Sequence, residues 1–433
     1  MVVFLAVGVM TFASAFSLVA AQEEAAPINA RGETTPPITP SAPGLMERDT
    51  LGGDWGGLRP LLKEHGITFQ PRLTQFYQGM NSGEGDTGSK YGGKADLLLN
   101  SDLSKLGSWK GLSLTVHGEY NFGESVNGRG GTLIPVNTAL MFPGIRGSDR
   151  YDVSAFFFTQ TFGDSVSLKA GKINLIDLSA SKPFQGGGGY DSFWNLTFAA
   201  PPSGTVPAYL LAAMLSVRTE LATFGFWVYD PTSVVNKSVF DKPFRDGVTL
   251  RGSVEFNVSI AGREGHQGFV ATYSTKNGTD WGTVDDLQLP PEDRGAVGTK
   301  NDRHYFGYTF NQYLYQSKEN PKEGFGLFGQ FGVSDGNPNP LHYSGFVGVG
   351  GTGLIPGRRR DNWGVGYYYD GLSNDLRHSL ESVQRIRDEQ GWEFFYNFAV
   401  TPWLTLGGDL QIITPSLARD TAVFSGLRTV VRF

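Results

Sequence analysis

The chain has 433 residues, of which 59 are glycine and none is cysteine, and aromatic residues make up 13% of it. The absence of cysteine excludes disulfides, thiol nucleophiles and cysteine-ligated metals. The formal net charge of −6 is mild for this length, which argues against nucleic acid as a partner and against a strongly cationic pore.

Residues 1–21 are predicted to be a secretory signal peptide. The first 20 residues are apolar or small and carry no charge, and small residues precede a possible cut before Gln22. The segment departs from the usual pattern because it has no Lys or Arg near its start, and a membrane anchor of about 20 residues is the alternative. No second apolar stretch of that kind follows, so no further helical span is expected.

Two short segments precede the main part of the chain. Residues 22–44 contain five prolines and almost no large apolar residue, which is typical of an extended linker. Residues 45–66 are predicted to form a short periplasmic helix. Asp54 can cap it, leucines follow at helical spacing, and Gly66 ends it.

From Ile67 to the end of the chain the hydrophobic period becomes two residues. The stretches LSLTVHGEYNF (112–122) and RGSVEFNVSI (251–260) alternate apolar and polar side chains, and glycine, asparagine and aspartate separate such segments. A soluble sandwich, a propeller and a transmembrane barrel all produce this alternation. Soluble strands average about 5–6 residues, whereas tilted membrane strands need about 9–11, so the length of the segments favours the barrel.

The last strand and the aromatic residues support the same prediction. Tryptophans lie near strand ends, as in the aromatic girdles of membrane barrels. The chain ends in mid-alternation with FSGLRTVVRF, which a closed barrel permits because its last strand pairs with its first. Leu427 is predicted to face lipid and Arg428 the lumen, because an arginine facing the bilayer midplane costs about 2–4 kcal/mol.

The predicted fold class is therefore all-β: a transmembrane antiparallel β-barrel over residues 67–433, preceded by the short helix. At about 22–26 residues for each strand with its turn or loop, this length gives about 14 to 16 strands. A barrel of this size has an aqueous lumen, so function is expected on the inward polar face.

Five blocks in order along the chain resemble the carbohydrate-selective porins of the OprB family. They are GDWGGLRPLLKEHGI (53–67), LIPVNTALMFPG (133–144), GKINLIDLSASKPFQGGGGYDSFWN (171–195), RRRDNWGVGYYY (358–369) and NFAVTPWLTLGGDLQIITP (397–415). The resemblance implies a 16-stranded outer-membrane barrel that lets glucose and related sugars diffuse into the periplasm. The terminal Phe433 resembles the aromatic end that the outer-membrane barrel assembly machinery recognises.

Catalysis finds little support in the sequence. None of the six histidines has a two-histidine metal spacing such as HExxH, and no GxSxG elbow occurs. A barrel-borne enzyme, which would pair a serine or asparagine with a histidine near the lipid-facing rim, is the rival from another functional class. No enzyme activity, cofactor or metal site is expected.

A sugar-selective lumen needs acidic and basic side chains that replace the hydrogen bonds of water, and an aromatic plane. Binding must stay weak, about −4 kcal/mol for a millimolar site, so that the sugar is released again. Alternation predicts inward candidates on the early strands: Arg72, Asp96, Asn100, His117, Glu119, Asn121 and Lys169. The alternative for each of them is a solvated residue of the barrel wall that plays no part in sugar selectivity.

The glycine-rich stretch 182–198 is too long for a periplasmic turn, so it is interpreted as an extracellular loop that can fold inward. Phe193 and Trp194 would then supply the stacking plane, and Asn195 an amide for hydroxyl groups. A rim loop with girdle aromatics is an equal alternative. The run Arg358–Arg360 beside Asp361 is interpreted as a loop that meets lipopolysaccharide phosphates or forms a local salt bridge.

The sequence thus predicts an outer-membrane porin for glucose-like sugars, with a general diffusion porin as the alternative. Its expected partners are carbohydrates, outer-membrane lipid with lipopolysaccharide, and the barrel assembly machinery. Because the inward acids and bases look paired, ion selectivity is expected to be modest. The sequence leaves the preferred sugar and the oligomeric state open.

Overall fold

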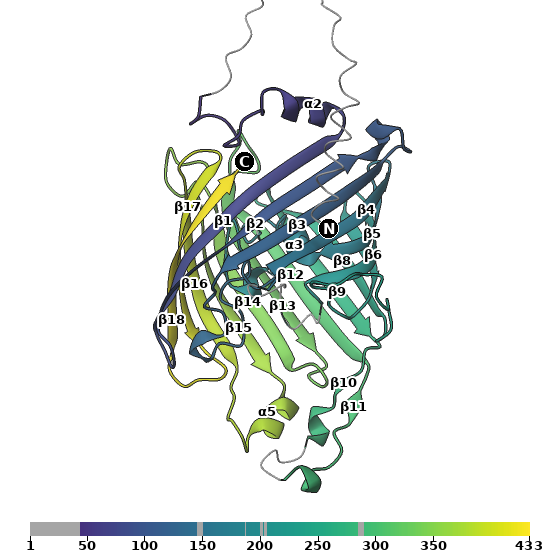
Figure 1. Ribbon diagram of the computed structural model, residues 1–433, viewed down its shortest axis with the longest axis vertical. Coiled ribbons are helices and arrows are strands. Elements are labelled where there is room, and N and C mark those ends of the chain that lie inside the picture. Colours follow the sequence, from purple (N-terminus) through teal and green to yellow (C-terminus); the bar gives the residue numbers. More distant parts are fainter. Residues whose placement is uncertain (1–43, 145–149, 187, 200–201, 203–205, 285–289) are drawn as a thin grey trace, which may run out of the picture. The chain divides into compact units, whose positions relative to one another are not determined.

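Sixteen strands of the computed structural model close into one antiparallel barrel (Figure 1). The structure describes residues 44–144, 150–186, 188–199, 202, 206–284 and 290–433, so the predicted signal peptide and nearly all of the predicted linker lie outside it. The barrel closes by pairing β1 (Ile67–Ser82) with β18 (Ala422–Arg432). This confirms the predicted 16-stranded all-β fold.

The barrel strands range from 8 residues in β7 to 16 in β1, and most are as long as a tilted membrane strand requires. The other barrel strands are β2 (Gly88–Asp102), β3 (Leu112–Gly123), β4 (Tyr151–Phe162), β5 (Val166–Asn174), β6 (Tyr209–Arg218), β7 (Ala222–Tyr229), β8 (Thr249–Ile260), β9 (Arg263–Ser274), β12 (Arg303–Gln316), β13 (Gly324–Ser334), β14 (Leu341–Thr352), β15 (Asn362–Leu372), β16 (Glu389–Ala399) and β17 (Leu404–Thr414). Outside the barrel wall lie the hairpin of β10 (Gly278–Thr279) with β11 (Thr299–Lys300), and the short helices α2 (Leu58–Glu64), α3 (Leu175–Ser179), α4 (Leu196–Ala199) and α5 (Asn374–Leu380).

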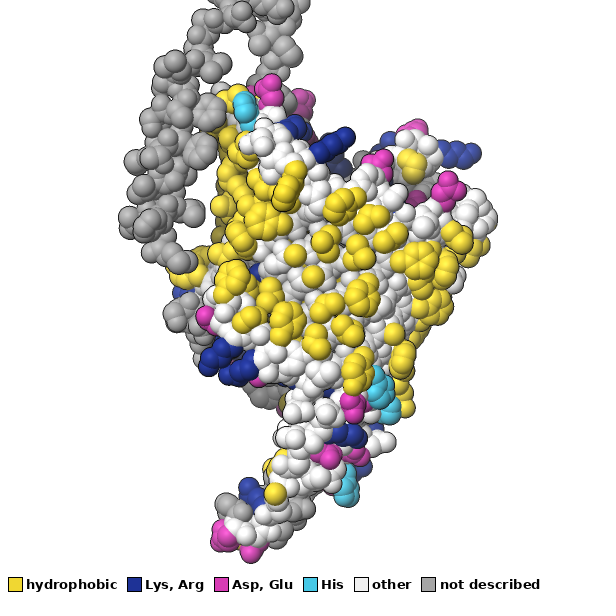
Figure 2. All heavy atoms as spheres, turned by 90° about the vertical axis from the view of Figure 1, so that its right-hand side faces the viewer, with side chains coloured by type: hydrophobic (Ala, Val, Ile, Leu, Met, Phe, Trp, Pro, Cys, Tyr) yellow, Lys and Arg dark blue, Asp and Glu magenta, His cyan; other side chains and the backbone are white. Residues whose placement is uncertain are grey.

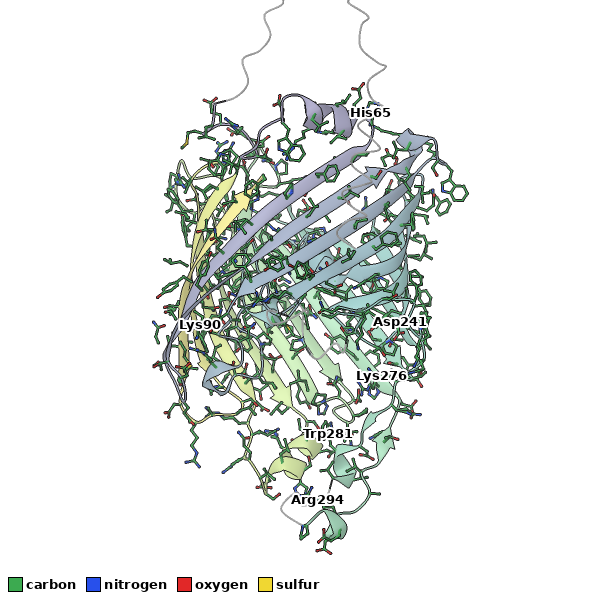
Figure 3. All side chains as sticks on the ribbon, in the orientation of Figure 1. His65, Lys90, Asp241, Lys276, Trp281 and Arg294 are labelled. Carbon is green, nitrogen blue, oxygen red and sulfur yellow. The ribbon has the colours of Figure 1, made fainter. Side chains whose placement is uncertain are left out.

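The two ends of the barrel differ in the length of their connections. Short turns such as 163–165 and 261–262 lie at the end that also carries α2 and the last residue of the chain (Figure 1). Long loops lie at the other end, where Figure 3 labels Trp281 and Arg294 in the connection from β9 to β12. Outer-membrane barrels have short periplasmic turns and longer extracellular loops, so the end with α2 is the periplasmic one.

The outer face is apolar and the inner face polar, as the alternation predicts. Figure 2 shows a band of hydrophobic side chains across the strands, with charged side chains above and below it. On β18 the outward Leu427 is 66% exposed, whereas the neighbouring Arg428 is only 1% exposed inside the barrel. The predicted parity of the closing strand is therefore confirmed.

The helix α2 begins after Gly57, whose φ is 91°, and no side chain caps it. The predicted cap is therefore wrong. The carboxylate of Asp54 instead accepts a hydrogen bond from the N–H of Gly56 at 3.1 Å, within the turns that precede the helix. Gly66 follows the helix with a φ of 82°, a backbone conformation in which glycine avoids the steric cost of a Cβ atom.

The segment around α2 is tied to the end of β18. The N–H of Leu51 donates to the carbonyl oxygen of Arg432 at 2.8 Å, and the guanidinium of Arg59 donates to a carbonyl oxygen of Phe433 at 2.7 Å. Among the described residues, no helix is long and apolar enough to cross a membrane.

Candidate functional site

The described residues of two extracellular loops fold into the barrel and narrow its lumen. Loop A is the described part of residues 124–150, between β3 and β4, and loop B is the described part of residues 175–208, between β5 and β6. Loop B reaches the opposite wall, where the ring of Phe193 lies 5.5 Å from Phe328 on β13 and 4.7 Å from Phe395 on β16. Trp194 packs edge-to-face against Phe76 of β1 at 5.0 Å.

Buried charged side chains of the wall hold the backbone of loop B. The carboxylate of Glu393 on β16 accepts hydrogen bonds from the backbone N–H groups of Trp194 and Asn195, the latter at 3.1 Å. Arg428 on β18 donates to the carbonyl oxygens of Gly189 and Ser192 at 2.7 and 2.9 Å. A buried charge is tolerated when hydrogen bonds replace its lost water, and these bonds serve that purpose.

Loop A is also attached to the wall through a buried carboxylate. The carboxylate of Glu389 on β16 accepts hydrogen bonds from the N–H groups of Leu133 and Ile134 at 2.6 and 3.0 Å. The two loops also bond to each other, because the N–H of Thr138 donates to the carbonyl oxygen of Trp194 at 2.7 Å. Both loops are thus bonded to β16 and to each other inside the barrel.

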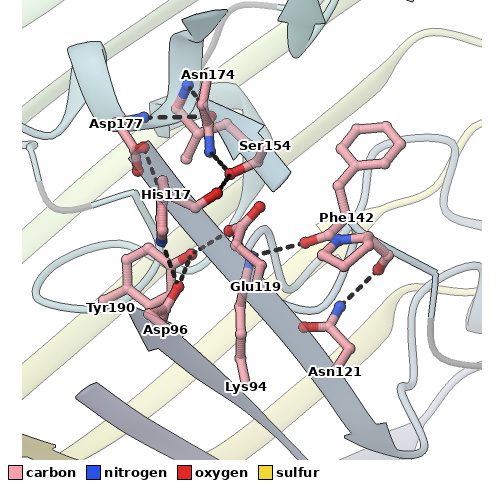
Figure 4. Close-up of polar contacts among 12 residues, drawn as sticks. Lys94, Asp96, His117, Glu119, Asn121, Phe142, Ser154, Asn174, Asp177 and Tyr190 are labelled. Atoms are coloured by element: carbon pink, nitrogen blue, oxygen red, sulfur yellow. Dashed lines mark hydrogen bonds and ion pairs between the residues drawn. The ribbon is translucent and has the colours of Figure 1, made fainter. Parts of the chain in front are cut away.

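A network of charged side chains lies under these loops on β1 to β3 (Figure 4). His117 lies between two carboxylates, with Nε2 3.0 Å from Asp96 and Nδ1 2.6 Å from Asp177 of α3. It can donate to both only when both ring nitrogens carry protons. Arg72 pairs with Asp96 at 3.3 Å, and the contact of His117 with Asp177 links the network to the start of loop B.

The second half of this network centres on Glu119. Its carboxylate forms an ion pair with Lys94 and accepts a hydrogen bond from the hydroxyl of Tyr209. Lys94 also donates to the carbonyl oxygen of Phe142 in loop A at 2.7 Å, and Asn121 donates to that of Pro143 at 2.6 Å. These bonds fix loop A from below.

Three members of the network, Asp96, His117 and Glu119, lie close enough to share a metal ion, with ligand atoms within 4.8 Å of one another. The same atoms already face the cations Arg72 and Lys94 and the hydroxyl of Tyr209. With a protonated His117, three cations balance the carboxylates of Asp96, Glu119 and Asp177. This donor set fits an ion-pair network better than a metal site.

The residues predicted from alternation do point inward, and most of them join this network. Asp96, His117, Glu119 and Asn121 are at most 5% exposed, and Phe193, Trp194 and Asn195 at most 1%. Arg72, Asn100 and Lys169 are only partly buried. Asn100 accepts a hydrogen bond from Thr115 at 2.9 Å, and the ammonium of Lys169 lies 5.8 Å from the ring centre of Phe157.

Several further inward residues were not selected by sequence reasoning. They lie on β7 to β13 and on the first part of loop B: Lys182, Trp227, Arg251, Glu255, Thr272 and Gln330. The alternation in RGSVEFNVSI, which was used to identify the strand, also places Arg251 inward with Glu255. The signal was present, but nothing in the sequence separated this strand from the others.

The run Arg358–Arg360 lies in the turn between β14 and β15, at the periplasmic end. Arg358 pairs with Asp361 at 2.7 Å and also donates to the carbonyl oxygen of Ala399 at 3.0 Å. The local salt bridge is confirmed. A contact with lipopolysaccharide is wrong for this run, because that lipid occupies the outer leaflet at the other end.

Comparisons with known proteins agree on one family. The family model described as "Carbohydrate-selective porin, OprB family" matches residues 86–433. The high-pH structure of Pseudomonas putida OprB is similar with a TM-score of 0.76 at 20% identity, covering 90% of this chain and 100% of that one. Its low-pH structure gives a TM-score of 0.54 at 18% identity, with 90% and 99% covered. At these identities the two structures support the fold alone, and no curated protein matches the chain.

Proposed function

The chain belongs to the OprB family of carbohydrate-selective porins, and we propose that this outer-membrane sugar channel conducts through the part of the lumen that loops A and B leave open. One observation carries the proposal. The buried carboxylates of Glu389 and Glu393 on β16 hold both loops inside the barrel, so a solute passes only through the part of the lumen that the loops leave open. A narrowed lumen brings a passing solute close to wall side chains, which selectivity requires.

The sequence-predicted candidates divide into two groups under this proposal. Arg72, Asn100 and Lys169 are partly exposed and are proposed to contact the sugar. The fully buried candidates act indirectly, because they hold the loops that define the passage: Asp96, His117, Glu119, Asn121, Phe193, Trp194 and Asn195. Glucose-like monosaccharides are the proposed cargo, since hydroxyl-rich neutral molecules exchange water for such amides and charged groups.

Diffusion through the channel is proposed to need no cofactor and no catalytic step. Contacts with lipopolysaccharide at the extracellular rim, and recognition of Phe433 by the barrel assembly machinery, are proposed for the same barrel. Hydrolysis of a lipid ester by the purified protein would contradict the proposal that the barrel has no enzyme activity.

Liposome swelling separates a sugar-selective channel from a general diffusion porin. We expect liposomes that contain the protein to swell faster in glucose than in a polyethylene glycol of the same hydrodynamic radius, because only the sugar forms hydrogen bonds along the wall. Empty liposomes serve as the control. Swelling rates that depend only on the size of the solute, and not on its chemistry, would support a general diffusion porin instead.

A further inference from the structure

One row of inward side chains crosses β5 to β9 without a carboxylate. The strand register pairs Lys169 with Met214, Met214 with Trp227, Trp227 with Arg251 and Arg251 with Thr272. Adjacent strands lie about 4.8 Å apart, so Lys169 and Arg251 are about 14 Å apart along the row. The row climbs toward the extracellular end because the strands of a barrel are tilted, and Arg251 lies two residues from that end of β8.

Arg251 has no carboxylate partner in the described part of the chain. Its guanidinium stacks on the ring of Trp227, 4.6 Å from the ring centre, which holds the planar group in a fixed orientation. Its Nε atom has no hydrogen-bond partner within the described residues. A planar donor that is held in place but unpaired is suited to a ligand carboxylate, which accepts two parallel N–H bonds.

A hydroxyl group without a partner continues the row beside Arg251. Thr272 pairs with Arg251 across β8 and β9 and is 5% exposed. Its Oγ1 atom has no partner among the described residues. Buried polar atoms are normally hydrogen-bonded, so this hydroxyl can pair with a hydroxyl group of a solute that reaches it.

The charge on this side of the lumen is predominantly positive. Lys182 at the start of loop B is exposed, and Arg251 and Glu255 are the charged groups near it. In the described structure, no carboxylate forms an ion pair with Lys169, Lys182 or Arg251.

We propose that the row from Lys169 to Thr272 is a subsite for acidic monosaccharides, with the sugar carboxylate on Arg251 and a hydroxyl group of the sugar on Thr272. The proposal rests on the sugar-channel function and adds a preference for aldonates and uronates over neutral sugars. Positive charge in a low-dielectric passage raises the local concentration of anions, and transient pairing with Arg251 favours the acidic sugar further.

The test compares glucuronate with glucose, which differ at one carbon, as blockers of single-channel current through the purified full-length protein. We expect glucuronate to block at a concentration about tenfold lower than glucose, a difference of about 1.4 kcal/mol, because only glucuronate can place a carboxylate on the guanidinium of Arg251. Arg251→Gln should remove this difference while glucose block persists. The matched control is Arg218→Gln, which removes an arginine at the periplasmic end of β6 and should leave the difference intact.

Two results would overturn the proposal. Equal block by glucuronate and glucose in the unmodified protein is one, and an equal effect of Arg251→Gln and Arg218→Gln is the other. Continued block by glucose in these cases would leave the sugar-channel function standing. Loss of block by both sugars would instead contradict that function itself.

Discussion

Replacing Glu393 with alanine should open the channel. The substitution removes the acceptor for the N–H groups of Trp194 and Asn195, both buried against β16. Leaving a buried N–H group without its acceptor costs about 1–3 kcal/mol, so loop B would lose a large part of its attachment. We expect a higher single-channel conductance and a larger size limit for solutes in swelling assays.

Glu255→Ala is the matched control for this prediction. Glu255 is an exposed carboxylate on β8, and no hydrogen bond from loop B reaches it in the described structure. Its removal should change ion preference but leave the size limit unchanged. Heat-modifiable migration on gels would establish that both variants are folded barrels. A folded Glu393→Ala variant with unmodified conductance and size limit would show that Glu393 does not hold the loop.

A charge on the outer face of the closing strand should prevent assembly. Leu427 lies in the middle of β18, is 66% exposed and faces the lipid. Leu427→Arg would place a charge in the lipid, which costs about 2–4 kcal/mol near the bilayer midplane. The neighbouring strands cannot move to shield this charge, because each is hydrogen-bonded to a strand on both of its sides. We expect a strongly reduced amount of heat-modifiable barrel in the outer membrane.

Leu427→Met controls for the change in shape, because it keeps an apolar side chain of similar volume. It should assemble normally. Assembly of Leu427→Arg at the level of the unmodified protein would place this face of β18 in a polar environment and contradict the lipid-facing parity.

The wall of the barrel could be predicted from the sequence because one physical rule governs it. Lipid on one side and water on the other force a period of two residues, and Leu427 and Arg428 follow that rule. The extent of α2 was less predictable. Asp54 has the right side chain for a cap, but the turn through Gly56 and Gly57 uses that carboxylate before the helix begins.

The conformation of the inward loops cannot be predicted from the period of two residues that governs the wall. Nothing in the period of β16 shows that Glu389 and Glu393 accept backbone N–H groups from loops more than 190 residues away in the chain. Trp194 was correctly placed in an inward loop, but the sequence could not show that its ring packs on Phe76 instead of facing the passage. Long-range contacts of this kind depend on the closed barrel.

The charge of the passage could not be predicted from the sequence either. A net charge of −6 describes the whole chain, whereas a solute meets only the groups that remain unpaired along its path. Acidic and basic residues on β1 to β3 neutralise one another beneath the loops, as Asp96 and Arg72 do. Arg251 stays unpaired because the described carboxylates near it do not reach it, which only the three-dimensional arrangement shows.

The most direct test of the central claim, that sugar contacts the wall of a narrowed lumen, is single-channel current in a planar bilayer as glucose is added. The account predicts that conductance falls as glucose rises into the millimolar range, where a site of about −4 kcal/mol becomes occupied. Conductance that stays constant over this range, apart from the change expected from solution viscosity, would contradict it.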